Sequence, residues 1–233
     1  MALLTLQGIT KRYRQGELEV NALSDINLEI KEGEFAALVG PSGSGKTTLL
    51  NIIGGLDSPT QGTTQLNDID ITGLKEAQLS DFRLFQLGFV FQSYNLVPVL
   101  SALENVELVM VLQGQHKKDC RQRAEHYLEL VGLKDVIHRR PSALSGGQQQ
   151  RVAVARALAA GPRLVLADEP TANLDSENAT ALLDIMHTLS HEEKTTFIFS
   201  THDPRVMDRA ERIITLQDGK IVNDEMHHHE HTQ

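Results

Sequence analysis

The chain has 233 residues, a formal net charge of −9 at neutral pH, and 4% aromatic residues with no tryptophan. That length suffices for one large domain, or for a core domain with an inserted subdomain, around a sizeable hydrophobic core. Because nucleic-acid partners normally need a basic face and stacking aromatics, the composition argues against DNA or RNA as a partner. The single cysteine, Cys120, cannot form an internal disulfide, which fits a reducing cytosol. We expect it to be a bystander on a polar helix.

The sequence predicts no membrane segment. Residues 1–6 give way at once to polar residues, so we expect no signal peptide. No apolar run approaches the roughly 20 residues that a membrane span requires. We therefore expect a soluble chain that reaches a membrane only through a partner protein.

The N-terminal part is predicted to form an antiparallel sheet edge. Residues 4–10 alternate between apolar and polar like a strand, and residues 11–14 are expected to interrupt it. Residues 27–30 alternate again and end in a turn. Tyr13, between the two strands, could place its ring on a nucleobase or could be an ordinary half-exposed strand residue.

A phosphate-binding loop follows. Residues 40–47 have the spacing G-x-x-x-x-G-K-[ST]. An apolar strand at 34–39 precedes the loop, and a helix at 48–53 follows it, so that the helix N-terminus would face an anion. This context predicts that the chain binds a nucleoside triphosphate.

The residue types in the loop suit that chemistry. Successive backbone N–H groups must turn inward around the phosphates, and a Cβ at Gly43 or Gly45 would crowd their approach. Lys46 brings a positive charge to the β- and γ-phosphates, and the Thr47 hydroxyl can bind Mg²⁺. The nucleotide-binding residues predicted here are Gly40, Ser42, Gly43, Ser44, Gly45, Lys46, Thr47 and Thr48.

The next strand is predicted to end in a ligand. After a strand-like stretch at 63–71, residues 87–92 form a second buried strand that ends in Gln92. Ligands bind at this C-terminal edge in parallel α/β sheets. Gln92 is therefore a candidate contact for Mg²⁺ or water, the alternative being a surface loop amide.

From about 93 to 160 the pattern changes to helices. Ser101 and Glu104 have the spacing of a capping box, which starts an apolar helix that continues to Leu112. A charged amphipathic helix is predicted over 117–131. We interpret this block as a helical insertion into an α/β core.

A second anion site is predicted at the start of the next helix. Ser145 is a good N-cap, and Gly146, Gly147 and Gln148 follow it before the helical run 149–158. Glycines at a helix N-terminus leave bare N–H groups for an anion. An ordinary capped helix is the alternative.

Two carboxylates end the buried strand at 163–170. Asp168 comes after four apolar residues and suits the Mg²⁺ shell of a phosphate-loop nucleotidase. Glu169 would project to the other face, where it could polarise an attacking water. The alternative is that the two carboxylates only mark the start of a surface loop.

The C-terminal part repeats the α/β pattern. A helix is predicted over 175–189 and a buried strand over 195–200, after which His202 lies on the ligand side and favours a γ-phosphate contact. Residues 213–216 and 220–222 are predicted to form a hairpin. The His-rich tail, 224–233, is expected to be disordered and could bind transition metals adventitiously.

Taken together, these motifs resemble the nucleotide-binding subunit of an ATP-binding-cassette transporter over about residues 3–223. Leu144-Ser145-Gly146-Gly147-Gln148 matches the signature motif of that family and lies upstream of a Walker B end. The resemblance implies a role for each of five further residues. These are adenine stacking for Tyr13, the Q-loop for Gln92, the catalytic base for Glu169, the D-loop for Asp175 and the switch histidine for His202.

Three phrases indicate the macrolide-exporter and lipoprotein-releasing branch, which includes the cell-division ATPase. They occupy residues 51–57, 89–92 and 169–175. Ala172 departs from the glycine common in that branch, a change that we expect to alter D-loop flexibility only slightly.

The resemblance implies an α/β fold. It consists of a phosphate-loop NTPase core with a RecA-like, mostly parallel sheet. An N-terminal antiparallel β subdomain precedes this core, and an α-helical subdomain is inserted at about 93–160. It also implies an ATPase that uses ATP and Mg²⁺ and pairs head to tail with a second copy around two ATP molecules. A membrane permease is the expected partner, which would place the chain in the cytoplasm, peripheral on the inner face of the cell membrane.

Three functions remain open at this stage. The chain could power an exporter or lipoprotein extractor, relay the ATP state as a regulatory cassette of the cell-division type, or act on DNA or ribosomes. The third is disfavoured by the negative charge and by the single cassette. The residues that handle ATP do not name the transported molecule, the partner or the direction of action.

Overall fold

The computed structural model describes residues 2–16 and 18–227. These residues form two compact units, one made of the chain up to Ser80 together with Thr196 onward, and the other of Asp81–Thr195. The strands of the first unit are β1 (Ala2–Gln15), β2 (Leu18–Lys31), β3 (Phe35–Val39), β4 (Gln61–Leu66), β5 (Ile69–Asp70), β8 (Thr196–Thr201), β9 (Arg212–Gln217) and β10 (Lys220–Met226), and its helices are α1 (Lys46–Ile53) and α7 (Pro204–Met207). The second unit holds β6 (Leu87–Val90), β7 (Leu164–Asp168), α3 (Ala102–Leu112), α4 (Lys117–Leu130), α5 (Gly146–Ala159) and α6 (Ser176–Glu193).

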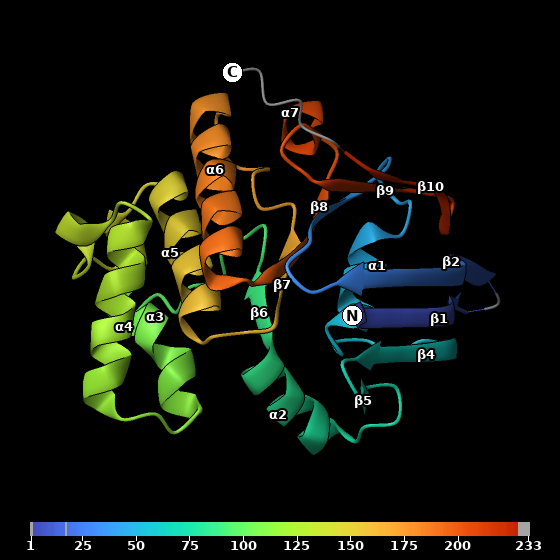
Figure 1. Ribbon diagram of the computed structural model, residues 1–233, viewed down its shortest axis with the longest axis horizontal. Coiled ribbons are helices and arrows are strands. Elements are labelled where there is room, and N and C mark those ends of the chain that lie inside the picture. Colours follow the sequence, from blue (N-terminus) through green and yellow to red (C-terminus); the bar gives the residue numbers. More distant parts are fainter. Residues whose placement is uncertain (1, 17, 228–233) are drawn as a thin grey trace. The chain divides into compact units, whose positions relative to one another are not determined.

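The first unit contains an antiparallel sheet with the strand order β2-β1-β4-β5, as the N-terminal pattern predicts (Figure 1). The predicted interruption at residues 11–14 is wrong, because β1 runs on to Gln15 and pairs with β2 throughout. Register shifts near Ile9 and Lys11 break the alternation of side chains there, which is why the pattern looks like a strand end. The outer half of β2 was likewise not predicted, since most of its side chains are exposed.

Strand β3 leads into the phosphate loop and lies in the middle of a second group of strands. It pairs in parallel with both β8 and β9, and β10 continues this group as a hairpin with β9. Every residue of β3 and β8 is buried, as expected for parallel strands covered on both faces. The ring of Phe35 packs 5.5 Å from that of Phe197 and 4.8 Å from that of Phe199, measured between centroids.

The second unit is built around α5. Helices α3, α4 and α6 and strand β6 all contact this helix, whose many alanines and valines are buried. Strand β6 can approach closely because its Gly88 has no side chain, and a Cβ there would lie 2.8 Å from the carbonyl oxygen of Ala157. Figure 1 shows α3, α4 and α5 packed side by side. Strands β6 and β7 pair in parallel.

The fold is therefore α/β, with an antiparallel sheet and a mostly parallel set of strands, as predicted. Helix α2 (Glu76–Gln86), where the chain passes from the first unit to the second, was not predicted, because it buries Phe82 and little else. Cys120 lies on the polar helix α4, as expected, but its side chain is fully buried, and burial raises the pKa of its thiol.

The C-terminal hairpin is longer than expected, since β10 runs to Met226. The predicted tail, 224–233, thus begins inside a strand, and its residues 228–233 lie outside the described part of the chain. None of the described helices is both long and apolar enough to cross a membrane.

Candidate nucleotide-binding site

The phosphate loop lies between β3 and α1, and its shape depends on glycine. Gly40 has φ 149°, and a Cβ there would lie 2.1 Å from the carbonyl oxygen of Leu216. Gly45 has φ 108°, and a Cβ would meet the carbonyl oxygen of Ala22 at 2.7 Å. A Cβ on Gly43 would meet nothing within 4 Å, although φ 79° still favours glycine. At Gly40 and Gly45 the backbone packed behind the loop leaves no room for a side chain. An anion bound in front of the loop would also need this space to approach the backbone.

The donors in the loop fit a phosphate group. Lys46 is 7% exposed, and its Nζ donates to the carbonyl oxygens of Gly40 and Pro41 at 2.8 and 3.1 Å, which holds the charge at the loop. The buried hydroxyl of Ser44 has no hydrogen-bond partner among the described residues. Buried polar atoms are normally satisfied, so an orphaned hydroxyl in a glycine-rich loop fits a site made for an anion.

The β9–β10 turn supports the loop from behind. The N–H of Gly219 donates to the carbonyl oxygen of Ser44 at 3.0 Å, and its carbonyl oxygen accepts from Ser24 N–H at 2.8 Å. A Cβ on Gly219 would lie 2.7 Å from the carbonyl oxygen of Ala22. Sequence analysis missed this contact, because an Asp-Gly hairpin turn carries no mark of what lies against it.

Tyr13 is held in place by a carboxylate that was not predicted. Its hydroxyl donates to Oδ2 of Asp57 at 2.7 Å, while Lys11 Nζ donates to Oδ1 at 2.6 Å and lies 4.8 Å from the centre of the Tyr13 ring. Burial and the bond to Asp57 raise the pKa of Tyr13, and Thr48 partly offsets this. Tyr13 as a residue remains 36% exposed.

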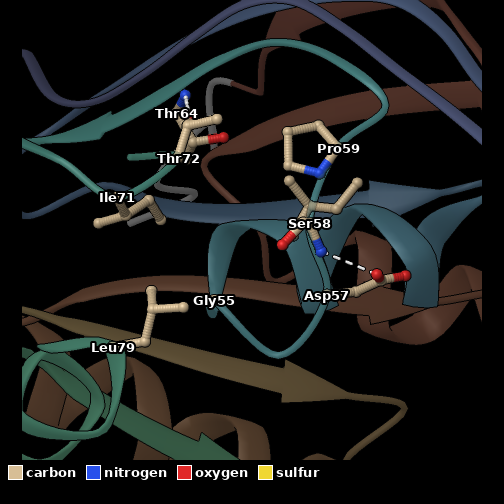
Figure 2. A pocket seen from close by; sticks show the side chains of 9 residues that line it. Gly55, Asp57, Ser58, Pro59, Thr64, Ile71, Thr72 and Leu79 are labelled. Atoms are coloured by element: carbon tan, nitrogen blue, oxygen red, sulfur yellow. Dashed lines mark hydrogen bonds between the residues drawn. The ribbon is translucent and has the colours of Figure 1, made fainter. Parts of the chain in front are cut away.

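Figure 2 shows a small pocket that Asp57 helps to line. The backbone N–H of Ser58 bonds to the Asp57 carboxylate at its rim, and Pro59 and Leu79 line it. Its wall includes Thr64, whose buried hydroxyl has no partner among the described residues. The lining contains neither Tyr13 nor any residue of the phosphate loop, so this pocket is distinct from the nucleotide site.

His202 emerges at the same sheet edge as the phosphate loop. It follows Thr201, which is the register partner of Val39, the last residue before the loop. Within the first unit, the register of β3 and β8 thus brings His202 to the strand end from which the glycine loop starts.

In the second unit, the parallel pairing of β6 and β7 places Gln92 and Asp168 at one edge. Val90 pairs with Ala167, so that Asp168 comes one residue and Gln92 two residues beyond the paired positions. The side-chain amide of Asn173 donates to the carbonyl oxygen of Gln92 at 2.9 Å. Asn173 was not singled out from sequence, because a loop asparagine has many possible uses.

Glu169 has a strained backbone. Its φ is 45°, a left-handed conformation uncommon outside glycine and costing of order 1–3 kcal/mol. Asp175 caps α6, because its carboxylate accepts from the N–H and from the side-chain amide of Asn178 at 2.9 and 2.7 Å. These hydrogen bonds lower the pKa of Asp175.

The Ser145 segment is a capping box at the start of α5. Ser145 Oγ accepts from Gln148 N–H, and Gln148 Oε1 accepts from Ser145 N–H, at 3.2 and 3.0 Å. The N–H groups of Gly146 and Gly147 are then the donors that the helix itself does not use. A Cβ on Gly146 would lie 2.9 Å from the hydroxyl of Tyr94, so the protein also approaches this glycine closely.

Known proteins share this arrangement. The family model described as "ABC transporter" matches residues 23–172. The lipoprotein-releasing system ATP-binding protein LolD of Anaeromyxobacter dehalogenans is 47% identical over 223 residues, which cover 95% of this chain and 93% of LolD. The macrolide export ATP-binding/permease protein MacB of Bartonella henselae is also 47% identical over 223 residues, but these make up only 34% of MacB.

The fold has a counterpart among solved structures. The cassette MJ0796 of Methanocaldococcus jannaschii, solved as a dimer in a post-hydrolysis state with ADP and Pi, superposes with a TM-score of 0.89 at 44% identity. The match covers 96% of this chain and 98% of that one. With the family model spanning more than half of the chain, the sequence, the fold and the geometry of the loop agree, and the chain belongs to the ABC transporter family as an ATP-binding and ATP-hydrolysing cassette.

Proposed function

We propose that this cassette dimerises head to tail around two ATP molecules and drives a membrane permease of the macrolide-exporter or lipoprotein-releasing type. The observation that carries the proposal is that each chain has one phosphate loop and one glycine-started helix, at Lys46 and Gly146. Each element supplies half of an anion site. Two copies arranged head to tail would complete two sites, and the relative MJ0796 is known as a dimer with bound ADP and Pi.

The first unit would hold the nucleotide. The ring of Tyr13 would stack on adenine, fixed by its bond to Asp57. The N–H groups of the glycine loop and the Lys46 ammonium would bind the β- and γ-phosphates through charge-assisted hydrogen bonds. Ser42, Ser44 and Thr48 would add hydroxyl donors, and His202 would contact the γ-phosphate from the end of β8.

The second unit would provide the groups that act on the bound nucleotide. Glu169 would accept a proton from the attacking water, as a general base. Gly146, Gly147 and the side chains of Ser145 and Gln148 would bind the γ-phosphate held by the partner copy, and Asp175 would lie near that interface. Loss of the γ-phosphate removes the shared contact, so hydrolysis would open the dimer.

The donor set also fits Mg²⁺. Thr47, Gln92 and Asp168 provide a hydroxyl, an amide oxygen and a carboxylate, all oxygen ligands of the kind that Mg²⁺ prefers. A bound Mg²⁺ would neutralise charge on the phosphates. Asp168 and Gln92 already share one edge of the β6–β7 pair, which suits this role.

Exposed apolar side chains in the second unit support a protein partner. Val99, Val111 and Leu112 are more than half exposed, and they lie on the segment after Gln92 and at the end of α3. Apolar exposure of this kind often marks an interaction site. We assign it to a segment of the permease, which would hold the chain at the inner face of the cell membrane.

The dimer is tested with Glu169→Gln, which removes the base and keeps the shape. With millimolar ATP and Mg²⁺ we expect a stable dimer with little turnover, measured by light scattering after size exclusion and by phosphate release. Lys46→Ala is the control, and we expect it to remain monomeric and to lose nucleotide binding. A monomeric Glu169→Gln protein under these conditions would refute the sandwich arrangement.

The partner is tested by affinity capture from detergent-solubilised membranes. The wild type should recover an integral membrane permease with a large extracytoplasmic domain, and Val111→Ser with Leu112→Ser should lose it. The matched control is Leu18→Ser with Val20→Ser, which removes two equally exposed apolar residues from β2. A partner bound to cell-wall hydrolases would favour the regulatory function, and recovery of ribosomes or DNA would contradict the transporter proposal.

A further inference from the structure

The loop after β6 contains two adjacent residues with left-handed backbones. Tyr94 has φ 62° and Asn95 has φ 49°, and neither is glycine. Side chains with a Cβ rarely adopt this conformation, and such residues persist only where surrounding contacts hold them. This pair is therefore held by contacts with the surrounding protein.

The main contact is Arg156, on the last turns of α5. Its Nη2 donates to the carbonyl oxygen of Tyr94 at 3.0 Å, and its Nη1 donates to the carbonyl oxygen of Asn95 at 2.6 Å. The planar guanidinium fork fits two acceptors at a fixed spacing, which a lysine cannot do. Burial lowers the pKa of Arg156, but an arginine stays protonated in proteins, so both bonds are charge-assisted.

Two more contacts connect the same loop to other parts of the second unit. Asn173 donates to the carbonyl oxygen of Gln92 at 2.9 Å. The Tyr94 hydroxyl lies so close to Gly146 that a Cβ on this glycine would be 2.9 Å from it. Residues 92–95 are thus held at Gln92, at the start of α5 and near its end.

We propose that Arg156 is a positioning residue, which fixes the backbone of residues 92–95 and so keeps Gln92 and the N-terminus of α5 in one rigid arrangement. The proposal rests on the role of Gln92 given above. It adds a residue that touches neither nucleotide nor metal, and a reason for the strained loop. Movement of α5 would be passed to Gln92 through the Arg156 fork, without an intermediate flexible segment.

Loss of the Arg156 contacts should affect ATP hydrolysis more than ATP binding. The hydrogen bonds of Ser44 and Lys46 described above lie within the first unit and do not involve Arg156. We therefore expect Arg156→Met to lower kcat at least tenfold, while KM for ATP changes less than threefold. Arg156→Lys keeps the charge but not the fork, and should give an intermediate kcat.

The matched control is Arg151→Met on the same helix. Arg151 also donates to a backbone carbonyl oxygen, that of Val131, but through one long contact of 3.5 Å. We expect its kcat to stay within threefold of wild type. Equal losses of kcat in the two methionine variants would show a general effect on α5 and overturn the proposal.

Hydrogen exchange gives a readout that is independent of ATP hydrolysis. In Arg156→Met, amides of residues 93–96 should exchange at least tenfold faster, whereas those of β6 should not change. Arg151→Met should leave both unchanged. Unchanged exchange in Arg156→Met, or faster exchange with unaltered kcat, would overturn the proposal. If Arg156→Met fails to fold, kcat and the hydrogen exchange of residues 93–96 are measured in Arg156→Lys instead, and the same outcomes support or overturn the proposal.

A rescue experiment distinguishes positioning from stability. Glycine adopts φ near 50° without steric cost, so adding Asn95→Gly to Arg156→Lys should recover at least threefold in kcat. No recovery would contradict the claim that Arg156 holds this backbone shape. Failure of Glu169→Gln to dimerise would count against the proposed function but would leave the exchange result intact.

Discussion

The phosphate loop and the loop after β6 both follow a parallel strand, and both contain left-handed residues, yet they reach this shape differently. In the phosphate loop the residues are Gly40, Gly43 and Gly45, which adopt it without a side-chain clash. In the other loop the left-handed residues are Tyr94 and Asn95, whose backbone conformation is held by hydrogen bonds from Arg156. The first loop is a receptor in which glycine removes the steric cost of the left-handed conformation. The second holds its shape only as long as α5 stays in place, which suits a part that transmits movement.

The largest effect is expected where glycine is required by the backbone behind the loop. In Gly40→Ala the new Cβ would meet the carbonyl oxygen of Leu216 at 2.1 Å. We expect ATP binding to fall by more than 100-fold, and the free energy of unfolding to fall by about 3 kcal/mol. The free energy of unfolding is measured by urea denaturation monitored by circular dichroism. ATP affinity is measured by titration with a fluorescent ATP analogue.

Gly43→Ala is the control, because a Cβ there meets nothing within 4 Å. Only the strain of a positive φ remains, which destabilises by about 1–2 kcal/mol. Equal losses of stability in the two variants would show that the clash with Leu216 is not what requires glycine at position 40.

A smaller effect is expected in the second loop. Asn95→Val places a β-branched residue at φ 49° and should lower the free energy of unfolding by about 2 kcal/mol, with ATP affinity unchanged. Ser93→Val, also exposed but without a positive φ, should change stability by less than about 0.5 kcal/mol. A fall in ATP affinity in Asn95→Val would remove the distinction between receptor and transmitter.

The smallest effect concerns the support of Tyr13. Burial alone would raise the pKa of Asp57, but hydrogen bonds from Lys11, Tyr13 and Ser58 outweigh it and lower the pKa below 3.8. The ionised carboxylate therefore stabilises the fold above that value, and this stability is lost as pH falls through the lower folded pKa. We expect Asp57→Asn to lose about 1 kcal/mol at pH 7, and the difference from wild type to shrink below about pH 4.

Thermal unfolding of both proteins between pH 3 and pH 7 measures this difference. A constant gap over the whole range would show that the charge of Asp57 contributes nothing. Tyr13→Phe, which keeps the ring and loses the bond to Asp57, should retain ATP affinity within about threefold if stacking is what binds adenine.

The same contrast explains what could be predicted from sequence. The strand, loop and helix around Lys46 were predicted because glycine spacing and apolar runs are local. The capping box at Ser101 and the N-cap at Ser145 were predicted for the same reason, and both are confirmed. Ser145 also forms a capping box, which was not predicted. The bond from Arg156 to Tyr94 spans 62 positions, and nothing near either residue indicates it.

Other misses have comparable causes. Helix α2 has apolar residues at helical spacing, Leu79, Phe82 and Phe85, but only Phe82 is buried, and the pattern was not recognised as a helix. The bulges of β1 hide the true length of that strand, and the contact between Gly219 and Ser44 joins the two ends of the chain. For the Gly219 contact the missing information lies in a partner far away in sequence.

The position of β3 has a consequence for how the protein is made on the ribosome. Both hydrogen-bonded neighbours of β3, the strands β8 and β9, are translated some 160 or more residues after it, and so is the Gly219 turn that holds Ser44. A nascent chain therefore exposes its glycine loop long before it can hold that loop in shape. We therefore expect nucleotide binding to begin only when translation of the cassette is nearly complete, so that unfinished chains would not engage ATP.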